Sequence, residues 1–200
     1  MTLWRNFVAM ATVVVFISVV AVAVADQGGR DPQPPATGRA TAFAWLHPGL
    51  VPAGWTTRRL PGSPARLSAP PGWRPARSDP GTRTMVSRGH SGRIVGYLNA
   101  TPRQGEESAV NWPAFRLAHN REEGDRDARR LAAGADLRFR SGTGSCLIDS
   151  YLTTSGNRFR EIACIVSGRS VTTVIVAAAP PSHWAVESPV LERAVNAFTT

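Results

Sequence analysis

The sequence predicts an α+β domain with a mainly antiparallel sheet flanked by helices, preceded by an N-terminal transmembrane helix. Three observations support this fold class. An uncharged apolar run covers residues 7–25. Short segments rich in β-branched and aromatic residues then alternate with turns that contain Gly and Pro. Two further segments, 111–124 and 188–198, carry apolar residues at helical spacing. Strands, a helix, more strands and a final helix are typical of a layered α+β structure.

The apolar run follows Arg5 and ends at Ala25. At about 1.5 Å per residue, a helix over 7–25 approaches the ~30 Å thickness of the hydrocarbon core. The apolar stretch of a signal peptide is usually shorter, about 7–15 residues, which favours an uncleaved anchor. Ala23-Val24-Ala25 also fits the small-x-small pattern of signal peptidase sites. Secretion after cleavage behind Ala25 therefore remains the alternative.

The leader also predicts how the chain is organised. Arg5 and the N-terminal amine favour a cytoplasmic N-terminus, so we expect residues 1–6 to be a cytoplasmic tail. The anchor at 7–25 is followed by a Pro/Gly-rich tether at 26–40, whose composition resists both helix and sheet. One α+β domain at 41–200 would then lie outside the membrane, in a single-pass protein or in its secreted form.

The charge of the chain is strongly positive, at +9, and every cation is an arginine. Abundant Ala, Gly, Pro, Val and Arg is typical of a GC-rich bacterial genome. The arginines are scattered singly or in pairs such as Arg58-Arg59, often beside acids, which indicates a solvated surface rather than a binding stripe. We expect no nucleic-acid partner. The expected partners are the membrane, through residues 7–25, and an unknown envelope protein or polymer.

The two cysteines, Cys146 and Cys164, flank a hairpin pattern. Ser155-Gly156-Asn157 is turn chemistry, because Gly readily adopts positive φ. If the hairpin folds about Ser155, Cys146 lies opposite Cys164. Directly opposed residues have Cα atoms about 4.5–5.5 Å apart, within the ~4.4–6.8 Å range of disulfides. We therefore predict a Cys146–Cys164 disulfide, which suits an oxidising compartment.

The first half of the domain carries patterns for turns, strands and one helix. Turns are predicted at Pro52–Trp55 and Pro70–Trp73, and strands at 83–88 and 93–101. Asn111-Trp112-Pro113 begins a helix, because Asn can cap it and proline is tolerated in its first turn.

The second half of the domain contains the remaining elements. Gly124 would end the helix that begins at Asn111, and 125–134 is ambiguous between a short helix and a strand. The unbroken run of small, mostly β-branched residues at 171–178 predicts a central strand covered on both faces. Ser188-Pro189 would cap and begin the C-terminal helix.

Few residues carry recognisable chemistry. His119 and Glu123 stand four apart on the predicted helix, a spacing that permits a shared metal but is more typical of a surface pair. Asp149 and Glu161 face each other in the predicted hairpin, which permits acid–base work. Neutralisation by the nearby arginines is favoured, namely by Arg138, Arg158 or Arg160.

The segments Leu67–Trp73 and Trp184–Phe198 carry a likeness to a known fold. With the strand and helix order, they resemble the PsbP-like and Mog-like fold, an antiparallel sheet flanked by helices. The chain also resembles uncharacterised exported or membrane-anchored bacterial proteins. Most members of that fold are accessory or binding proteins, so the resemblance implies a non-catalytic role.

We therefore expect a membrane-tethered extracytoplasmic domain, not an enzyme, that binds a protein or envelope partner and needs no cofactor or metal. The alternative is a carrier or sensor of a small ligand such as an anion, with arginines around a pocket in the sheet face. A hydrolase is less favoured, since it requires His119 or His183 to meet Ser145 or Asp149.

Overall fold

The computed structural model describes residues 42–200. The predicted cytoplasmic tail, membrane anchor and tether, at 1–40, lie outside these described residues. Within residues 42–200, none of the helices is long and apolar enough to cross a membrane.

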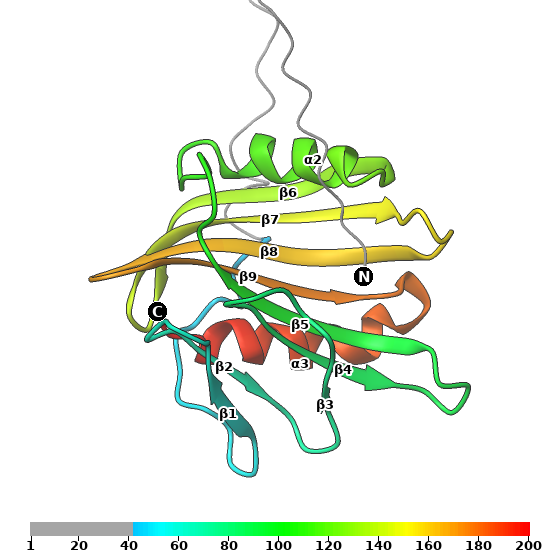
Figure 1. The fold of residues 1–200 in the computed structure, drawn as a ribbon, viewed down its shortest axis with the longest axis horizontal. Coiled ribbons are helices and arrows are strands. Elements are labelled where there is room, and N and C mark those ends of the chain that lie inside the picture. The colour runs from blue at the N-terminus through cyan, green and yellow to red at the C-terminus, as the bar shows by residue number, and fades with distance from the viewer. Residues whose placement is uncertain (1–41) are drawn as a thin grey trace, which may run out of the picture. The chain divides into compact units, whose positions relative to one another are not determined.

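A seven-stranded sheet forms the centre of the domain, and every neighbouring pair of its strands is antiparallel. The strand order is β3-β4-β5-β9-β8-β7-β6 (Figure 1). The strands are β3 (Arg74–Pro75), β4 (Arg83–Arg88), β5 (Ile94–Pro102), β6 (Arg126–Phe139), β7 (Gly142–Leu152), β8 (Arg158–Gly168) and β9 (Thr172–Ala179). A separate two-stranded sheet pairs β1 (Thr56–Arg59) with β2 (Arg66–Ala69). The α+β class with a large antiparallel sheet is confirmed.

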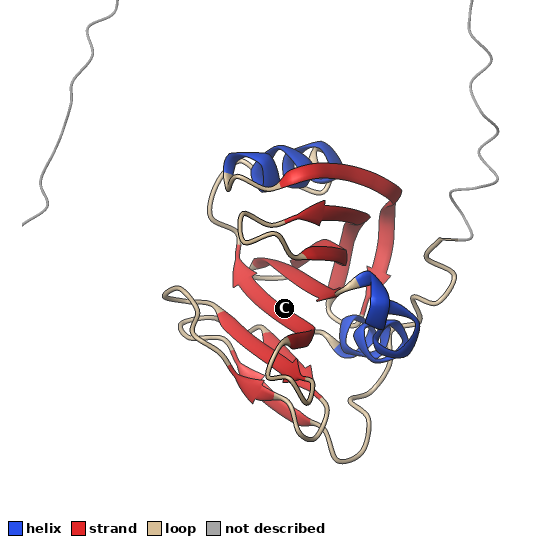
Figure 2. Ribbon diagram, turned by 90° about the vertical axis from the view of Figure 1, so that its right-hand side faces the viewer, coloured by secondary structure: helices blue, strands red, loops and turns tan. Residues whose placement is uncertain are grey.

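The two helices lie on opposite faces of the sheet. Figure 2 shows the sheet edge-on between them, with α2 (Trp112–Glu122) at the top and α3 (Trp184–Ala197) at the side. A short 3-10 turn, η1 (Pro181–His183), leads into α3. This arrangement buries both faces of the central strands, and therefore the strand at 172–179 has no polar face.

Strand alternation assigns each residue to one of two cores. On β9, Ile175 and Ala177 belong to the core under α3, whereas Val174 and Val176 belong to the core under α2. The α3 core also contains the first described segment, where Phe43 is buried and Trp45 packs alongside. Side chains two residues apart on a strand share a face, so one strand serves both cores.

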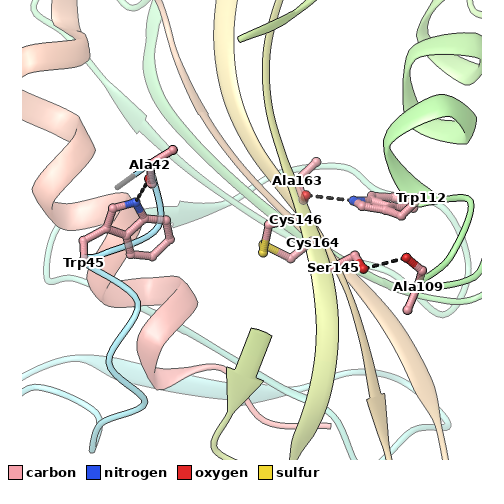
Figure 3. The surroundings of a disulfide bond; sticks show 8 residues. All are labelled: Ala42, Trp45, Ala109, Trp112, Ser145, Cys146, Ala163 and Cys164. Atoms are coloured by element: carbon pink, nitrogen blue, oxygen red, sulfur yellow. Dashed lines mark hydrogen bonds between the residues drawn. A yellow bond between two sulfur atoms is a disulfide. The ribbon is translucent and has the colours of Figure 1, made fainter. Parts of the chain in front are cut away.

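Cys146 and Cys164 form a disulfide in the α3 core. They are directly paired on β7 and β8, with Cα atoms 4.1 Å apart. Figure 3 shows the bond on the side of the sheet that carries Trp45, while Trp112 lies on the other side. The pairs Ile148–Ile162 and Tyr151–Phe159 also match the register predicted from a turn at Ser155.

Helix α2 begins where the sequence predicts, with Asn111 at the N-cap position. The Asn111 side chain does not cap the helix; its Oδ1 instead accepts a hydrogen bond from the backbone N–H of Ser108 (2.7 Å). Gly124, with φ of +88°, follows the helix end as predicted. The ambiguous segment 125–134 is a strand, because it forms most of β6.

The predicted start of the C-terminal helix is wrong. The helix begins at Trp184, and Pro189 lies inside it. Trp184 packs against the α3 core and beneath the Arg160 guanidinium, 4.6 Å from its ring centre. This packing favours helix before Pro189 and offsets the backbone hydrogen bond that proline cannot donate.

Candidate functional site

Helix α2 covers only part of its face of the sheet, and a cleft of about 820 Å³ lies beside it. The helix contacts β6, β7 and β8. The cleft extends from one side of α2 across β9 and β5 to the segment around Asp79 and to Gln104–Glu107. Its size is within the range of ordinary ligand pockets.

The floor of the cleft consists of outward-facing residues of β9 and β5. Val174, Val176 and Ala178 of β9 lie beside Thr101, Asn99 and Tyr97 of β5, respectively, since these residues are paired in the sheet. The β9 side chains are small and apolar. The β5 side chains carry a hydroxyl, an amide and a phenol, so the floor is apolar along β9 and polar along β5.

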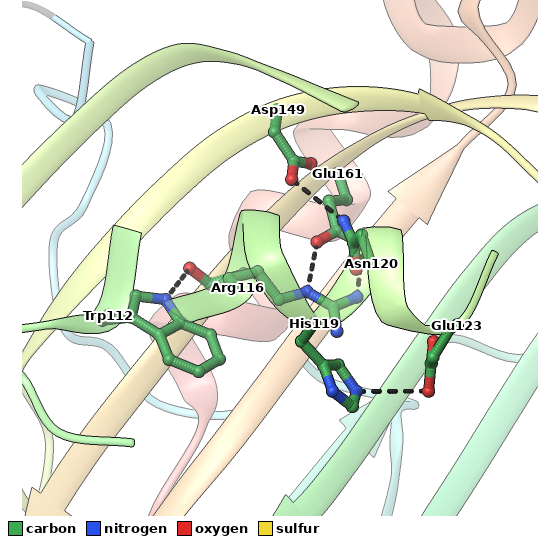
Figure 4. A network of polar contacts seen from close by, with 8 residues as sticks. Trp112, Arg116, His119, Asn120, Glu123, Asp149 and Glu161 are labelled. Atoms are coloured by element: carbon green, nitrogen blue, oxygen red, sulfur yellow. Dashed lines mark hydrogen bonds and ion pairs between the residues drawn. The ribbon is translucent and has the colours of Figure 1, made fainter. Parts of the chain in front are cut away.

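A buried polar network anchors α2 beside the cleft (Figure 4). Arg116 of α2 donates two hydrogen bonds to Glu161 of β8, from Nε to Oε1 (2.7 Å) and from Nη2 to Oε2 (3.0 Å). Asn120, one turn further along, donates from Nδ2 to Oδ2 of Asp149 (3.2 Å). The side chain of Glu161 is fully buried and that of Arg116 nearly so, so this is a bidentate ion pair shielded from water.

Asp149 and Glu161 occupy directly paired positions on β7 and β8. Burial and, second to it, the charge of Glu161 raise the pKa of Asp149 to about 9, against the lowering effect of Arg116. Asp149 is therefore neutral at pH 7. Burial lowers the pKa of Arg116, but the Glu161 carboxylate outweighs this effect and leaves that pKa raised. One cation, one carboxylate and one neutral acid give a network that is balanced in charge.

The arginine in this network is not one that the sequence predicts. Arg158 pairs with Asp127 at the surface (2.7 Å). Arg160 points to the opposite face, where it lies over Trp184. The reason is strand alternation: on β8, Glu161 faces α2, so its neighbour Arg160 faces α3. Arg116, 45 residues away in sequence, supplies the charge from α2.

Aromatic rings form the wall of the cleft along α2. Trp112 stacks on Phe115 with ring centres 6.3 Å apart, and Phe115 stacks on His119 at 6.2 Å. The Trp112 indole N–H donates to the carbonyl of Ala163 (2.8 Å), and this bond fixes the row of stacked rings to β8. Tyr151 and Phe159 form a second stacked pair at the cleft. Trp112, Phe115 and His119 thus share one face of the helix, as their helical spacing predicts.

The other candidate residues are not brought together. His119 Nε2 lies 3.1 Å from Oε1 of Glu123, as an exposed helix pair. Ser145 donates to the carbonyl of Ala109 (2.5 Å), and His183 contacts Ser182 at the start of α3. Within residues 42–200, no hydrogen bond joins Ser145 or Asp149 to a histidine, and no group of three potential ligands is placed to hold a metal ion.

The cleft itself has no signature in the sequence. Its residues come from β5, α2, β7, β8 and β9 and from loops at 79–82, 104–107 and 153–154. The only usable signal is the polar alternation of Tyr97, Asn99 and Thr101 on a central strand, which is unusual for a strand covered on both faces. That alternation marks a part of the sheet that α2 leaves open.

No protein-family model and no curated protein matches this chain. Among solved structures, cyanobacterial PsbP (CyanoP) from Synechocystis sp. PCC 6803 matches 76% of this chain and 95% of its own, with 14% identity and a TM-score of 0.55. A protein of unknown function from Pseudomonas aeruginosa, PA94, described as a putative regulator, matches 74% and 98%, with 13% identity and a TM-score of 0.48.

The E65A mutant of Mog1 matches 72% of this chain and 87% of its own, with 13% identity and a TM-score of 0.46. At these identities a likeness concerns the fold alone, and the CyanoP match is the one that carries it. The resemblance inferred from the sequence is thereby confirmed: the domain has a fold similar to that of PsbP.

Proposed function

We propose that this chain is a membrane-tethered extracytoplasmic domain that binds a protein or cell-envelope partner without catalysing a reaction, and that the partner binds in the cleft beside α2. Residues 1–6 would lie in the cytoplasm, 7–25 in the membrane and 26–40 in the tether. The domain at 41–200 would lie outside. The cleft is the single observation that carries the binding role, since it is large, partly apolar and rimmed by polar groups.

The disulfide supports the extracytoplasmic compartment. Cys146 and Cys164 are the only cysteines of the chain, and both are fully buried in the bond. Structural disulfides persist in oxidising compartments and are rare in bacterial cytoplasm.

The position of the first described residues supports access to the cleft. Ala42 and Trp45 lie on the α3 side of the sheet, whereas Trp112, in the cleft wall, lies on the α2 side (Figure 3). The described chain thus starts on the face opposite the cleft.

In the part of the chain that the structure describes, the candidate reactive groups do not converge, which supports a non-catalytic role. The paired buried acids Glu161 and Asp149 are held by Arg116 and Asn120, and neither of these two acids is among the residues that line the cleft. The hydroxyl of Ser145 is held by Ala109. A binding site requires complementary surface, which the cleft has, and no activated nucleophile.

The test is site-specific photo-crosslinking of the full chain in its native membrane. A photoreactive residue replaces Gln104 or Thr154, which are exposed at the cleft, or Val186, an exposed residue of α3 outside it. We expect a discrete adduct from the two cleft positions and none from Val186. Equal labelling at all three positions, or none, would contradict a partner in the cleft.

A small-ligand carrier is the second candidate, and the volume of the cleft favours it. Native mass spectrometry of the gently purified chain distinguishes the two. A bound species of a few hundred daltons, released when Gln104 is replaced by Trp to block the cleft, identifies a carrier. An unliganded chain that still crosslinks to a protein identifies partner binding.

A further inference from the structure

The lining of the cleft has a charge opposite in sign to that of the whole protein. The chain carries +9. The cleft, however, is lined by four carboxylates and a single arginine, Arg116. That arginine already holds Glu161 through two hydrogen bonds, so it is not free to bind a ligand anion. The four carboxylates are those of Asp79, Glu107, Glu123 and Asp125.

Most of these carboxylates have no cation beside them. Within residues 42–200, Asp79, Glu107 and Asp125 take part in no ion pair, and Glu123 contacts only His119. Glu107 is buried and accepts hydrogen bonds from the backbone N–H groups of Gln104 (2.6 Å) and Gly105 (2.8 Å). These bonds hold its position and leave its charge uncompensated.

Asp125 shows the consequence of this crowding. Its carboxyl is partly buried: burial raises its pKa most and the nearby charge of Glu123 raises it further, while the charge of Arg116 lowers it. A raised pKa means that the surroundings disfavour one more negative charge. A cation placed beside Asp125 and Glu123 would relieve this repulsion.

The remaining walls suit the apolar part of a ligand. The stacked rings of Trp112, Phe115 and His119 lie along one side, and Tyr151 with Phe159 lies along another. Val174 and Val176 form an apolar floor. Aromatic faces attract cations and also cover aliphatic or aromatic carbon.

From these observations we infer that the cleft binds an organic cation, meaning an ammonium group carried on an apolar body. This inference deepens the proposed function and rests on it, since it names the chemistry that the same cleft recognises. Carboxylates and rings line the same half-open cleft, so the ammonium group would lie against the acids and its apolar body against the rings. The alternative that the sequence left open, arginines around a pocket for an anion, would require a lining of the opposite sign.

Two sources supply this chemistry. A free amine would occupy the cleft alone, and an amine-bearing side chain would enter it as part of a polypeptide partner. The two share the recognition step, because the acids and rings contact only the ammonium group and the carbon that carries it.

The first experiment compares three aromatic probes that differ in charge: benzylammonium, benzyl alcohol and benzoate. Binding to the full chain in nanodiscs of zwitterionic lipid is measured by calorimetry. We expect benzylammonium to bind at least about fivefold more tightly than benzyl alcohol, since hydrogen bonds to charged groups are the stronger ones, and benzoate to bind least. Equal binding of the three probes, or tighter binding of benzoate, would overturn the inference.

The second experiment removes single cleft charges. Asp79→Asn and Asp125→Asn should each weaken benzylammonium binding by about fivefold. Asp136→Asn is the matched control, because Asp136 is an exposed acid of β6 that does not line the cleft. Asp79 is itself exposed, so its variant tests the idea even if Asp125→Asn unfolds the domain. Cleft variants that bind like Asp136→Asn would refute the inference.

The third experiment separates the two sources and the two proposals. A lysine-containing peptide that binds more tightly than benzylammonium, and more tightly than its norleucine counterpart, identifies a polypeptide source. Benzylammonium binding without that gain identifies a free amine. If Gln104 crosslinks to a partner but benzylammonium binds no better than the other probes, the proposed function stands and the organic-cation inference is refuted. If benzylammonium is preferred but Gln104 gives no crosslink, only the protein partner is refuted.

Discussion

Asp149 and Glu161 lie directly opposite each other on β7 and β8, with both side chains buried beneath α2. Two buried carboxyls in this position cannot both ionise cheaply, so the fold keeps Asp149 protonated and pairs Glu161 with Arg116. This one relationship ties the helix that walls the cleft to the centre of the sheet. It also makes the stability of the domain depend on pH.

The first prediction concerns that pH dependence. In the folded chain the pKa of Asp149 is about 9, whereas an unfolded Asp titrates near about 4. The folded state thus holds a proton that the unfolded state loses, and the stabilisation is lost progressively as the pH rises from about 4 to about 9. Asp149→Asn has no proton to lose. Between pH 5 and pH 9, the unfolding free energy of this variant should rise relative to that of the wild type by at least about 1.4 kcal/mol.

Urea unfolding of both proteins across this range checks the prediction. The difference between them cancels titration by the other acids. Parallel stability curves would contradict a raised pKa for Asp149.

A second prediction concerns the ion pair between Arg116 and Glu161. Arg116→Met leaves a fully buried carboxylate without a cation, which costs about 3–5 kcal/mol of unfolding free energy. Glu161→Gln in the same chain should restore much of that loss, because the remaining group is neutral. The matched control is Arg158→Met, which breaks an exposed pair with Asp127 and should cost less than about 1 kcal/mol. Equal losses in the two single variants would argue against a special role for Arg116.

A third prediction concerns the disulfide. It closes a loop with a sequence separation of 18, and removing such a bond costs about 3 kcal/mol or less, because the hairpin itself already closes the loop. Wild-type protein should lose stability when reductant is added during denaturant unfolding. The variant with both Cys146→Ala and Cys164→Ala should be insensitive to reductant. Two titratable thiols in the native protein would contradict the bond.

A fourth prediction concerns packing on the α3 side. A Cβ at Gly96 would lie 2.7 Å from the ring of Trp73, and that ring is buried in the α3 core. Gly96→Ala should therefore cost about 1–3 kcal/mol. Gly49→Ala is the control, since a Cβ there meets only an ordinary contact at 3.6 Å. Thermal unfolding of the two variants measures the difference, and equal midpoints would show that the ring yields.

Local patterns in the sequence predict much of the fold. The turn at Ser155 determines the register of the hairpin, so the pairing of Asp149 with Glu161 follows from counting along two strands. The limits of α2 are marked by Pro113 in its first turn and by Gly124 after its end, and both act within one helical turn. Asn111 stands at the predicted N-cap position without capping the helix through its side chain. By contrast, the start of α3 depends on how Trp184 packs, and therefore Ser188-Pro189 misled the prediction.

By itself the sequence determined the α+β class, the hairpin register and the pairing of the two cysteines, because each depends on neighbours along the chain. Only the tertiary structure decided that Arg116 neutralises Glu161 and that α2 leaves β5 and β9 open as an acidic, aromatic cleft. Those features join residues far apart in sequence, and their partners are chosen by which faces of sheet and helix meet in space.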